Sequence, residues 1–262
     1  MMVVGVMPVV AAWVCSVADG PGSGGWAREF RSFGALHGVT ALGFLGTIVG
    51  ACVLGRWLQR RDREFALRVG WLLFMLGWQC WTVVFFLLPG VYHPAVSLPL
   101  HVCDLVPWVG MIALLTQHPL FRAVLFYWGI GLSTQAFFTP VLQEGVADWN
   151  YWLFWVGHTQ IVGSAVYDLV VLRFRPAWRD FGLGLFFTIG YAALVSAINI
   201  PNGWNYGYIG DASPERPTII DRLGPWPLRV GWLGVIVVAM FAAMTAGVRV
   251  WVRFASRARL DR

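Results

Sequence analysis

A histidine, a cysteine and an aspartate lie close together at the start of one apolar segment. Residues 98–105 read Leu-Pro-Leu-His-Val-Cys-Asp-Leu and include His101, Cys103 and Asp104. A cysteine near a histidine can act as a thiolate nucleophile, because the imidazole takes the thiol proton and later returns it. This stretch is therefore the first candidate for covalent chemistry in the chain.

Helical spacing indicates how these side chains can cooperate. If the segment is helical throughout, His101 and Asp104 share a face, whereas Cys103 lies about 200° around the helix from His101. The base for Cys103 is then expected from another segment, and His158 is the candidate at a similar depth. Asp104 or Gln135 is expected to orient the imidazole or to donate to an oxyanion.

The same residues also admit a purely structural interpretation. A cysteine within a membrane helix often packs as a small hydrophobic residue, and His158 could be a buried, hydrogen-bonded histidine. His37 and Asp104 could pair across helices and fix packing. A metal site built from His101, Asp104, His158 and His37 lacks a paired-ligand motif such as HExxH. No metal or other cofactor is therefore expected.

The composition indicates a membrane protein. Of the 262 residues, 58% are hydrophobic and only 12% are charged, against about 25% charged in soluble domains. The net charge of +6 comes from arginine, since the chain contains no lysine, and no nucleic-acid motif accompanies it. The four cysteines form no CxxC pair, so neither a disulfide framework nor a zinc knuckle is expected.

Long apolar stretches predict an all-α, seven-helix transmembrane bundle in the cell membrane. We expect an N-terminal extension over residues 1–29 with a short apolar segment, a transmembrane domain over 30–255, and a basic tail over 256–262. The oligomeric state does not follow from the sequence. The predicted spans are 33–55, 68–88, 97–115, 120–139, 150–172, 181–200 and 226–250.

The arginines predict how these spans are oriented. With seven spans, 14 arginines fall in alternate connections and the C-terminal tail, and 5 fall on the opposite side. Since cytoplasmic loops carry the excess of basic residues, the N-terminus is predicted outside and the C-terminus in the cytoplasm.

Nearly all polar groups within the predicted spans then lie in the outer half of the bilayer. Such groups are rare in membrane helices and mark functional sites when they face the protein interior. A pocket in the outer half, open to lipid and capped by the loop Pro201–Pro227, is therefore predicted. Its expected residues are His37, His101, Cys103, Asp104, Gln135, His158, Asn199, Asn205 and Tyr206.

Together these motifs resemble the YwaF-like bacterial integral membrane proteins over roughly residues 30–250. The His-x-Cys-Asp block followed by Gly-Pro-Trp-Pro before the last span carries most of the likeness. The matching segments are Leu98-Pro99-Leu100-His101-Val102-Cys103-Asp104-Leu105, Trp128-Gly129, Gln135-Ala136, Thr139-Pro140, His158, Asn199, Asn205-Tyr206, Asp221 and Leu223-Gly224-Pro225-Trp226-Pro227.

The resemblance implies an activity on lipids. The animal relatives, the transmembrane protein 164 group, are described as acyltransferases that use a cysteine and a histidine. More distant relatives, the androgen-induced hydrolases, cleave fatty esters. By similarity, Cys103 would be the acyl-accepting nucleophile and His158 its base, with membrane phospholipids or fatty acyl esters as substrates.

Other classes of function remain open from the sequence alone. The same pocket could hydrolyse fatty esters or phospholipids with water as the acceptor. A small-molecule transporter or receptor is a further alternative, although no inverted repeat is visible. A lipid-binding protein without catalysis would leave Cys103 inert.

Overall fold

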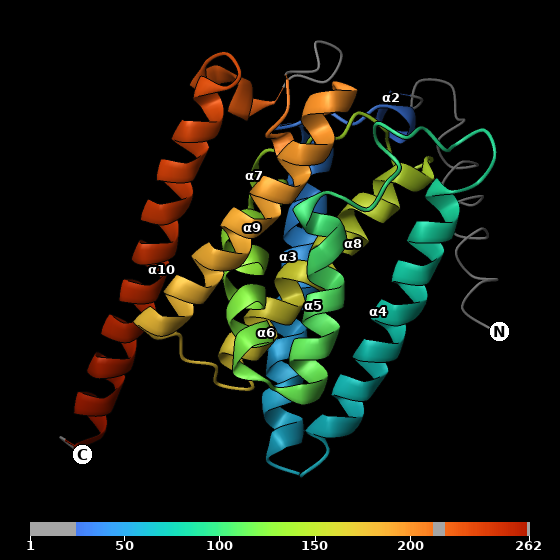
Figure 1. Cartoon of the computed structure of the whole chain (residues 1–262). Coiled ribbons are helices and arrows are strands. Elements are labelled where there is room, and N and C mark those ends of the chain that lie inside the picture. Colours follow the sequence, from blue (N-terminus) through green and yellow to red (C-terminus); the bar gives the residue numbers. More distant parts are fainter. Residues whose placement is uncertain (1–24, 212–217, 261–262) are drawn as a thin grey trace.

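A computed structural model describes residues 25–211 and 218–260, and this part of the chain is helical with irregular connections (Figure 1). It contains seven main helical regions and three short elements. The main regions are α3 (Ala35–Gln59), α4 (Glu64–Phe86), α5 (Val102–Thr116), α6 (Pro119–Val124) with its continuation, α8 (Trp149–Val170), α9 (Trp178–Asn202) and α10 (Leu228–Leu260). The short elements are α2 (Gly25–Arg28) and the 3-10 helices η2 (Tyr206–Tyr208) and η3 (Ile219–Leu223).

Each predicted span coincides with one of the seven helical regions. Four of them, α3, α4, α9 and α10, are long and apolar enough to cross a membrane. The fifth apolar helix, α5, is shorter, with 15 residues. We call the end where α5 and α8 begin the upper end, and the end with the α3–α4 turn the lower end (Figure 1).

Helix α8 is the centre of the bundle. It packs against α3, α4, α5 and the π-helix that continues α6, and most of its residues are buried, including Trp155, Ile161 and Ala165. A helix enclosed by protein can carry polar side chains without exposing them to lipid, which explains the mixed composition of α8.

The region after α6 is not a regular α-helix. Residues Leu125–Leu132 (η1) form a π-helix, and the short helix α7 (Gln135–Phe138) follows after two residues. Gly129 allows this segment to approach α8 closely, since a Cβ there would lie 2.8 Å from the Ala165 Cβ. Short π segments are frequent near functional sites.

The chain before α3 packs onto the upper end. Ala27 and Phe30 are buried in a cluster that includes Phe137 and Trp155. The Phe30 N–H donates to the Gln143 carbonyl at 2.7 Å. The last residues of the expected N-terminal extension thus join the core, while residues 1–24 lie outside the described part.

Candidate active site at the upper end

Helix α5 begins at Val102, with His101 as the residue that caps it. The backbone at His101 is extended, and its N–H donates to Asp104 Oδ2 at 2.9 Å. The expectation that His101 and Asp104 share a helical face is therefore wrong. Asp104 instead accepts a hydrogen bond at the start of the helix, the position where a carboxylate is favoured.

Cys103 occupies the second position of this helix as a free, half-buried thiol. The first N–H groups of an α-helix have no partner within the helix. Here the Asp104 N–H bonds to the His101 carbonyl at 3.0 Å, at the residue that caps the helix. The positive end of the helix dipole favours a thiolate at this position, whereas burial of the sulfur beside Asp104 opposes it.

His158 is held by the carbonyl of the preceding turn. Its Nδ1 lies 2.8 Å from the Phe154 carbonyl oxygen, and the Phe154 ring lies 4.3 Å from the imidazole ring. Since a carbonyl can only accept, Nδ1 carries the proton and Nε2 presents a lone pair. Within residues 25–211 and 218–260, Nε2 has no hydrogen-bond partner.

The expected orienting groups do not bind this imidazole. Asp104 is bonded to His101, and Gln135 is exposed at the start of α7. The backbone of α8 itself therefore fixes the tautomer of His158. The sequence could not show this hydrogen bond. Every residue within a helix has a carbonyl four positions earlier, so the spacing does not single out His158.

The packing of α5 against α8 gives the relative heights of the two side chains. A Cβ on Gly110 would lie 3.8 Å from the Ser164 Cβ, so these two positions are level. Both helices start at the upper end (Figure 1). Cys103 precedes Gly110 by seven residues and His158 precedes Ser164 by six, so they lie about 10 and 9 Å above that level.

The two side chains lie on helix faces that both pack against η1. Cys103 is on the same side of α5 as Gly110, where a Cβ would meet Leu125 of η1 at 3.4 Å and Ser164 of α8 at 3.8 Å. His158 is on the side of α8 that carries Ile161 and Ala165, which face η1. In the described residues no hydrogen bond joins the Cys103 sulfur to His158.

Gln160 is a polar residue of this region that the sequence analysis did not select. It is fully buried, and neither its Nε2 nor its Oε1 has a partner. It lies one turn above Ser164 on the α5-facing side of α8, and therefore about 6 Å above the Gly110 level. An unpaired buried amide is unfavourable by about 1–3 kcal/mol, so Gln160 is a candidate to bond to a substrate group.

The segment after α9 is clamped onto the start of α5. The Asn199 side chain pairs with both backbone groups of Tyr206: Nδ2 donates to the carbonyl at 2.8 Å, and Oδ1 accepts from the N–H at 3.1 Å. The Tyr206 hydroxyl donates to the Pro94 carbonyl at 2.6 Å and accepts from the Leu98 N–H at 3.0 Å. Burial raises the pKa of this phenol, which keeps it protonated as a donor.

His101 takes part in the same clamp. Its Nδ1 accepts from the Gly207 N–H at 3.2 Å, and its ring packs against Tyr206 and Tyr208. When neutral, His101 therefore carries its proton on Nε2. Gly207 has φ +65°, and a Cβ there would lie 2.5 Å from the Tyr191 hydroxyl oxygen.

A second set of contacts closes the far side of this loop. Asn205 Oδ1 accepts from the Gly210 N–H at 3.0 Å. Arg229, which is 1% exposed, bonds to Asp221 and to the Gly210 carbonyl. Asn199, Asn205 and Tyr206 thus hold the loop, and residues 212–217 of that loop lie outside the described part.

His37 lies apart from the cysteine. Its Nδ1 accepts from the Phe33 N–H at 2.9 Å, and its Nε2 donates to the Phe137 carbonyl at 2.9 Å. It joins α3 to α7 and does not pair with Asp104, as one alternative expected. Among the residues that the structure describes, no three His, Cys, Asp or Glu side chains gather as a metal site.

Comparison with known proteins places the chain among membrane proteins of one family. The model of the TMEM164 family matches residues 32–245. The chain belongs to the TMEM164 family. No curated protein and no solved structure matches it.

The TMEM164 match covers every residue of the candidate site, from His37 to Tyr206, and the ion pair between Asp221 and Arg229. It also covers the helices α3 to α9 and the first half of α10. The chain is accordingly a multi-pass membrane protein with four candidate spans.

Proposed function

We propose that this TMEM164-family protein is a membrane-embedded lipid acyltransferase or transacylase. The observation that carries the proposal is the family match over residues 32–245, because TMEM164 is linked to acyltransferase activity. The local chemistry is compatible with it: α5 carries a free thiol at its N-terminus, and the upper half of α8 carries an imidazole with an unengaged Nε2.

In the proposed reaction, Cys103 attacks the ester carbonyl of a glycerolipid. His158 Nε2 takes the thiol proton, a carbon–sulfur bond forms, and the carbon–oxygen bond of the ester breaks. The departing lipid oxygen receives the proton from the imidazolium. An acceptor hydroxyl then loses its proton to Nε2 and attacks the thioester, which restores the thiol and forms the new ester.

The tetrahedral intermediates carry an oxyanion that needs donors. The N–H groups at the start of α5 are one source, and the unpaired amide of Gln160 is a second. Acyl transfer requires Nε2 to come within hydrogen-bonding reach of the sulfur or of the acceptor. Such contacts are often long before substrate binds and shorten in the complex.

The proposed arrangement in the membrane has seven spans, with the N-terminus outside, the C-terminus in the cytoplasm, and the site in the outer half. The asymmetry of 14 and 5 arginines supports this orientation. In this arrangement the clamp formed by Asn199, Tyr206 and His101 would lie on the outer side of the site.

The test is mass spectrometry of the purified protein after incubation with mixed phospholipids. We expect a hydroxylamine-sensitive acyl adduct on Cys103 that is absent from Cys103→Ser and retained in Cys80→Ser, since Cys80 is an exposed cysteine on α4. His158→Ala is expected to slow formation and discharge of the adduct. A thiol that stays unmodified in the wild type would refute the covalent reaction. Discharge to water in place of a lipid would identify a hydrolase.

A further inference from the structure

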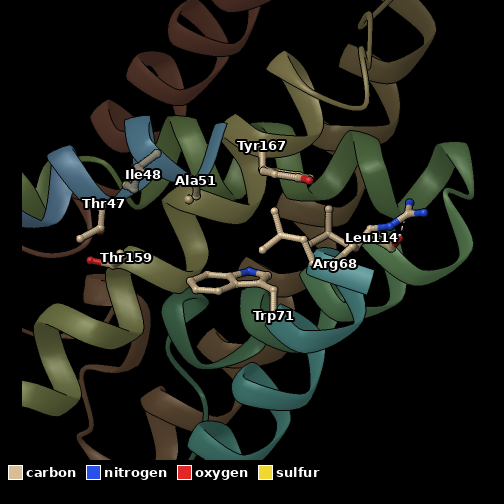
Figure 2. A pocket seen from close by; sticks show the side chains of 10 residues that line it. Thr47, Ile48, Ala51, Arg68, Trp71, Leu114, Thr159 and Tyr167 are labelled. Carbon is tan, nitrogen blue, oxygen red and sulfur yellow. Dashed lines mark hydrogen bonds between the residues drawn. The ribbon is translucent and has the colours of Figure 1, made fainter. Parts of the chain in front are cut away.

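A cavity of about 90 Å³ is lined by side chains of α3, α4, α5 and α8 (Figure 2). Its lining residue on α5 is Leu114, at the opposite end of that helix from Cys103. Thr47 and Ala51 line it from α3, Leu67 and Trp71 from α4, and Gly163 from α8. Thr47 is exposed, and Ala51 and Leu67 are half-buried. The cavity therefore reaches the surface between α3 and α4, two helices with largely exposed apolar faces.

Apart from the Nε–H of Arg68, the polar side-chain groups that line the cavity are bonded to protein groups. The Trp71 Nε1–H donates to Ser164 Oγ at 3.0 Å, and the Tyr167 hydroxyl donates to Glu64 at 2.8 Å. Thr47 and Thr159 bond to carbonyls one turn earlier in their helices, at 2.7 Å each. A water molecule needs two to four polar partners, so the cavity favours hydrocarbon.

Arg68 lies where this apolar space meets polar groups. Its Nη1 donates to the Leu114 carbonyl at 3.2 Å (Figure 2), and its Nη2 lies 3.6 Å from Glu64. Its Nε–H is buried and has no partner. An ester carbonyl of a lipid is a group to which this N–H could donate.

Exposed arginines lie next to the cavity at the lower end. The turn between α3 and α4 contains Arg60, Arg61 and Arg63, all exposed, with Asp62 as the acidic residue among them. Leu67 and Trp71 follow Arg63 by four and eight residues, hence by about 6 and 12 Å along α4. If a lipid headgroup lies at the turn, this spacing places the cavity beside the part of the acyl chain nearest the headgroup.

We propose that this cavity and the arginine turn bind an anionic glycerophospholipid, with one acyl chain between α3 and α4 and the phosphate at Arg60, Arg61 and Arg63. Arginines near a membrane surface attract anionic headgroups. The site is separate from Cys103 and does not depend on the proposed acyl transfer.

The experiment is native mass spectrometry of the full chain, delipidated and offered equal amounts of dioleoyl phosphatidylglycerol and dioleoyl phosphatidylcholine. We expect the wild type to retain one phosphatidylglycerol in preference to phosphatidylcholine. Ala51→Phe fills the cavity and is expected to abolish retention. Val49→Phe adds the same ring on the exposed face of α3 and is expected to leave it unchanged. Thr47→Phe, at the exposed rim, provides the same test if Ala51→Phe does not fold.

The headgroup is tested separately. Arg60→Gln/Arg61→Gln/Arg63→Gln is expected to weaken retention of phosphatidylglycerol by roughly fivefold per arginine, whereas Arg249→Gln/Arg253→Gln on α10 is the matched control with no effect. Cys103→Ser is expected to bind as the wild type does. Equal retention of both lipids by the wild type would overturn the proposal, and so would retention that survives both cavity-filling changes.

Discussion

Removing the Asn199 side chain tests whether its hydrogen bonds to Tyr206 hold the segment after α9 against the start of α5. Asn199 is 1% exposed and pairs with both backbone groups of Tyr206. Asn199→Ala leaves a buried N–H and a buried carbonyl without partners, each unfavourable by about 1–3 kcal/mol. We therefore expect the clamped state to lose about 3 kcal/mol relative to the open state, after partial rehydration.

The assay is amide hydrogen exchange at Gly207 and Gly210. Their N–H groups bond to His101 and Asn205, and not to Asn199, so they report release of the whole segment. A loss of about 3 kcal/mol corresponds to exchange that is roughly a hundredfold faster. The control is Asn202→Ala, one turn later on α9, where the exposed side chain only bonds back to the Ile198 carbonyl.

Equal exchange in the two variants would refute the reasoning. So would unchanged protection in Asn199→Ala, because it would mean that the segment is held by its other contacts. If the proposed function holds, acyl transfer by Asn199→Ala should also fall, while Asn202→Ala remains active.

Three further predictions concern packing, a buried ion pair and the unpaired amide. Gly129→Ala is expected to lower thermal stability by about 1–3 kcal/mol, because its Cβ would meet the Ala165 Cβ at 2.8 Å. The control is Gly157→Ala, where a Cβ meets no atom within 4 Å, and it should be neutral in the same melting assay. Arg229→Gln is expected to destabilise by about 3 kcal/mol or more, since it removes the cation that bonds to Asp221 and to the Gly210 carbonyl. The exposed Arg222→Gln should change stability by about 0.5 kcal/mol at most. Equal melting temperatures of the two variants would contradict this. Gln160→Leu is expected to stabilise the protein by about 1–3 kcal/mol, because it removes two unpaired buried polar atoms. It is also expected to slow adduct formation on Cys103, because it removes a proposed oxyanion donor. A less stable or fully active variant would show that the amide has another role.

The sequence predicted the seven helical regions because long apolar runs are a local property. It also predicted that polar groups gather near one end, and the structure brings His101, Asn199 and Tyr206 together there. The hydrogen-bond partners of these residues could not be predicted from the sequence. The Tyr206 hydroxyl, for example, bonds to a carbonyl 112 positions earlier. Such contacts depend on how whole helices pack.

Other features escaped prediction for more specific reasons. The helix start at Val102 differs from the predicted 97 because His101 is extended and caps the helix. The π-helix at Leu125–Leu132 is buried over its first five residues and strongly apolar, so it has no polar face that would reveal its period. Gln160 belongs to no motif, and only its burial without partners distinguishes it. The roles of Cys103 and His158 remain predictions.

The π-helix at Leu125–Leu132 has a consequence for how this family can change its length. A π turn holds one residue more than the α turn it replaces, so it absorbs an insertion while the flanking helix keeps its direction. Gly129, within the π-helix, packs against Ala165, and Phe137, which follows it, packs against Trp155. A family member that lacks one residue in this segment can therefore form a plain α-helix here and still align both flanks. In an alignment of family members, a one-residue gap in this stretch would mark a change from a π-helix to an α-helix.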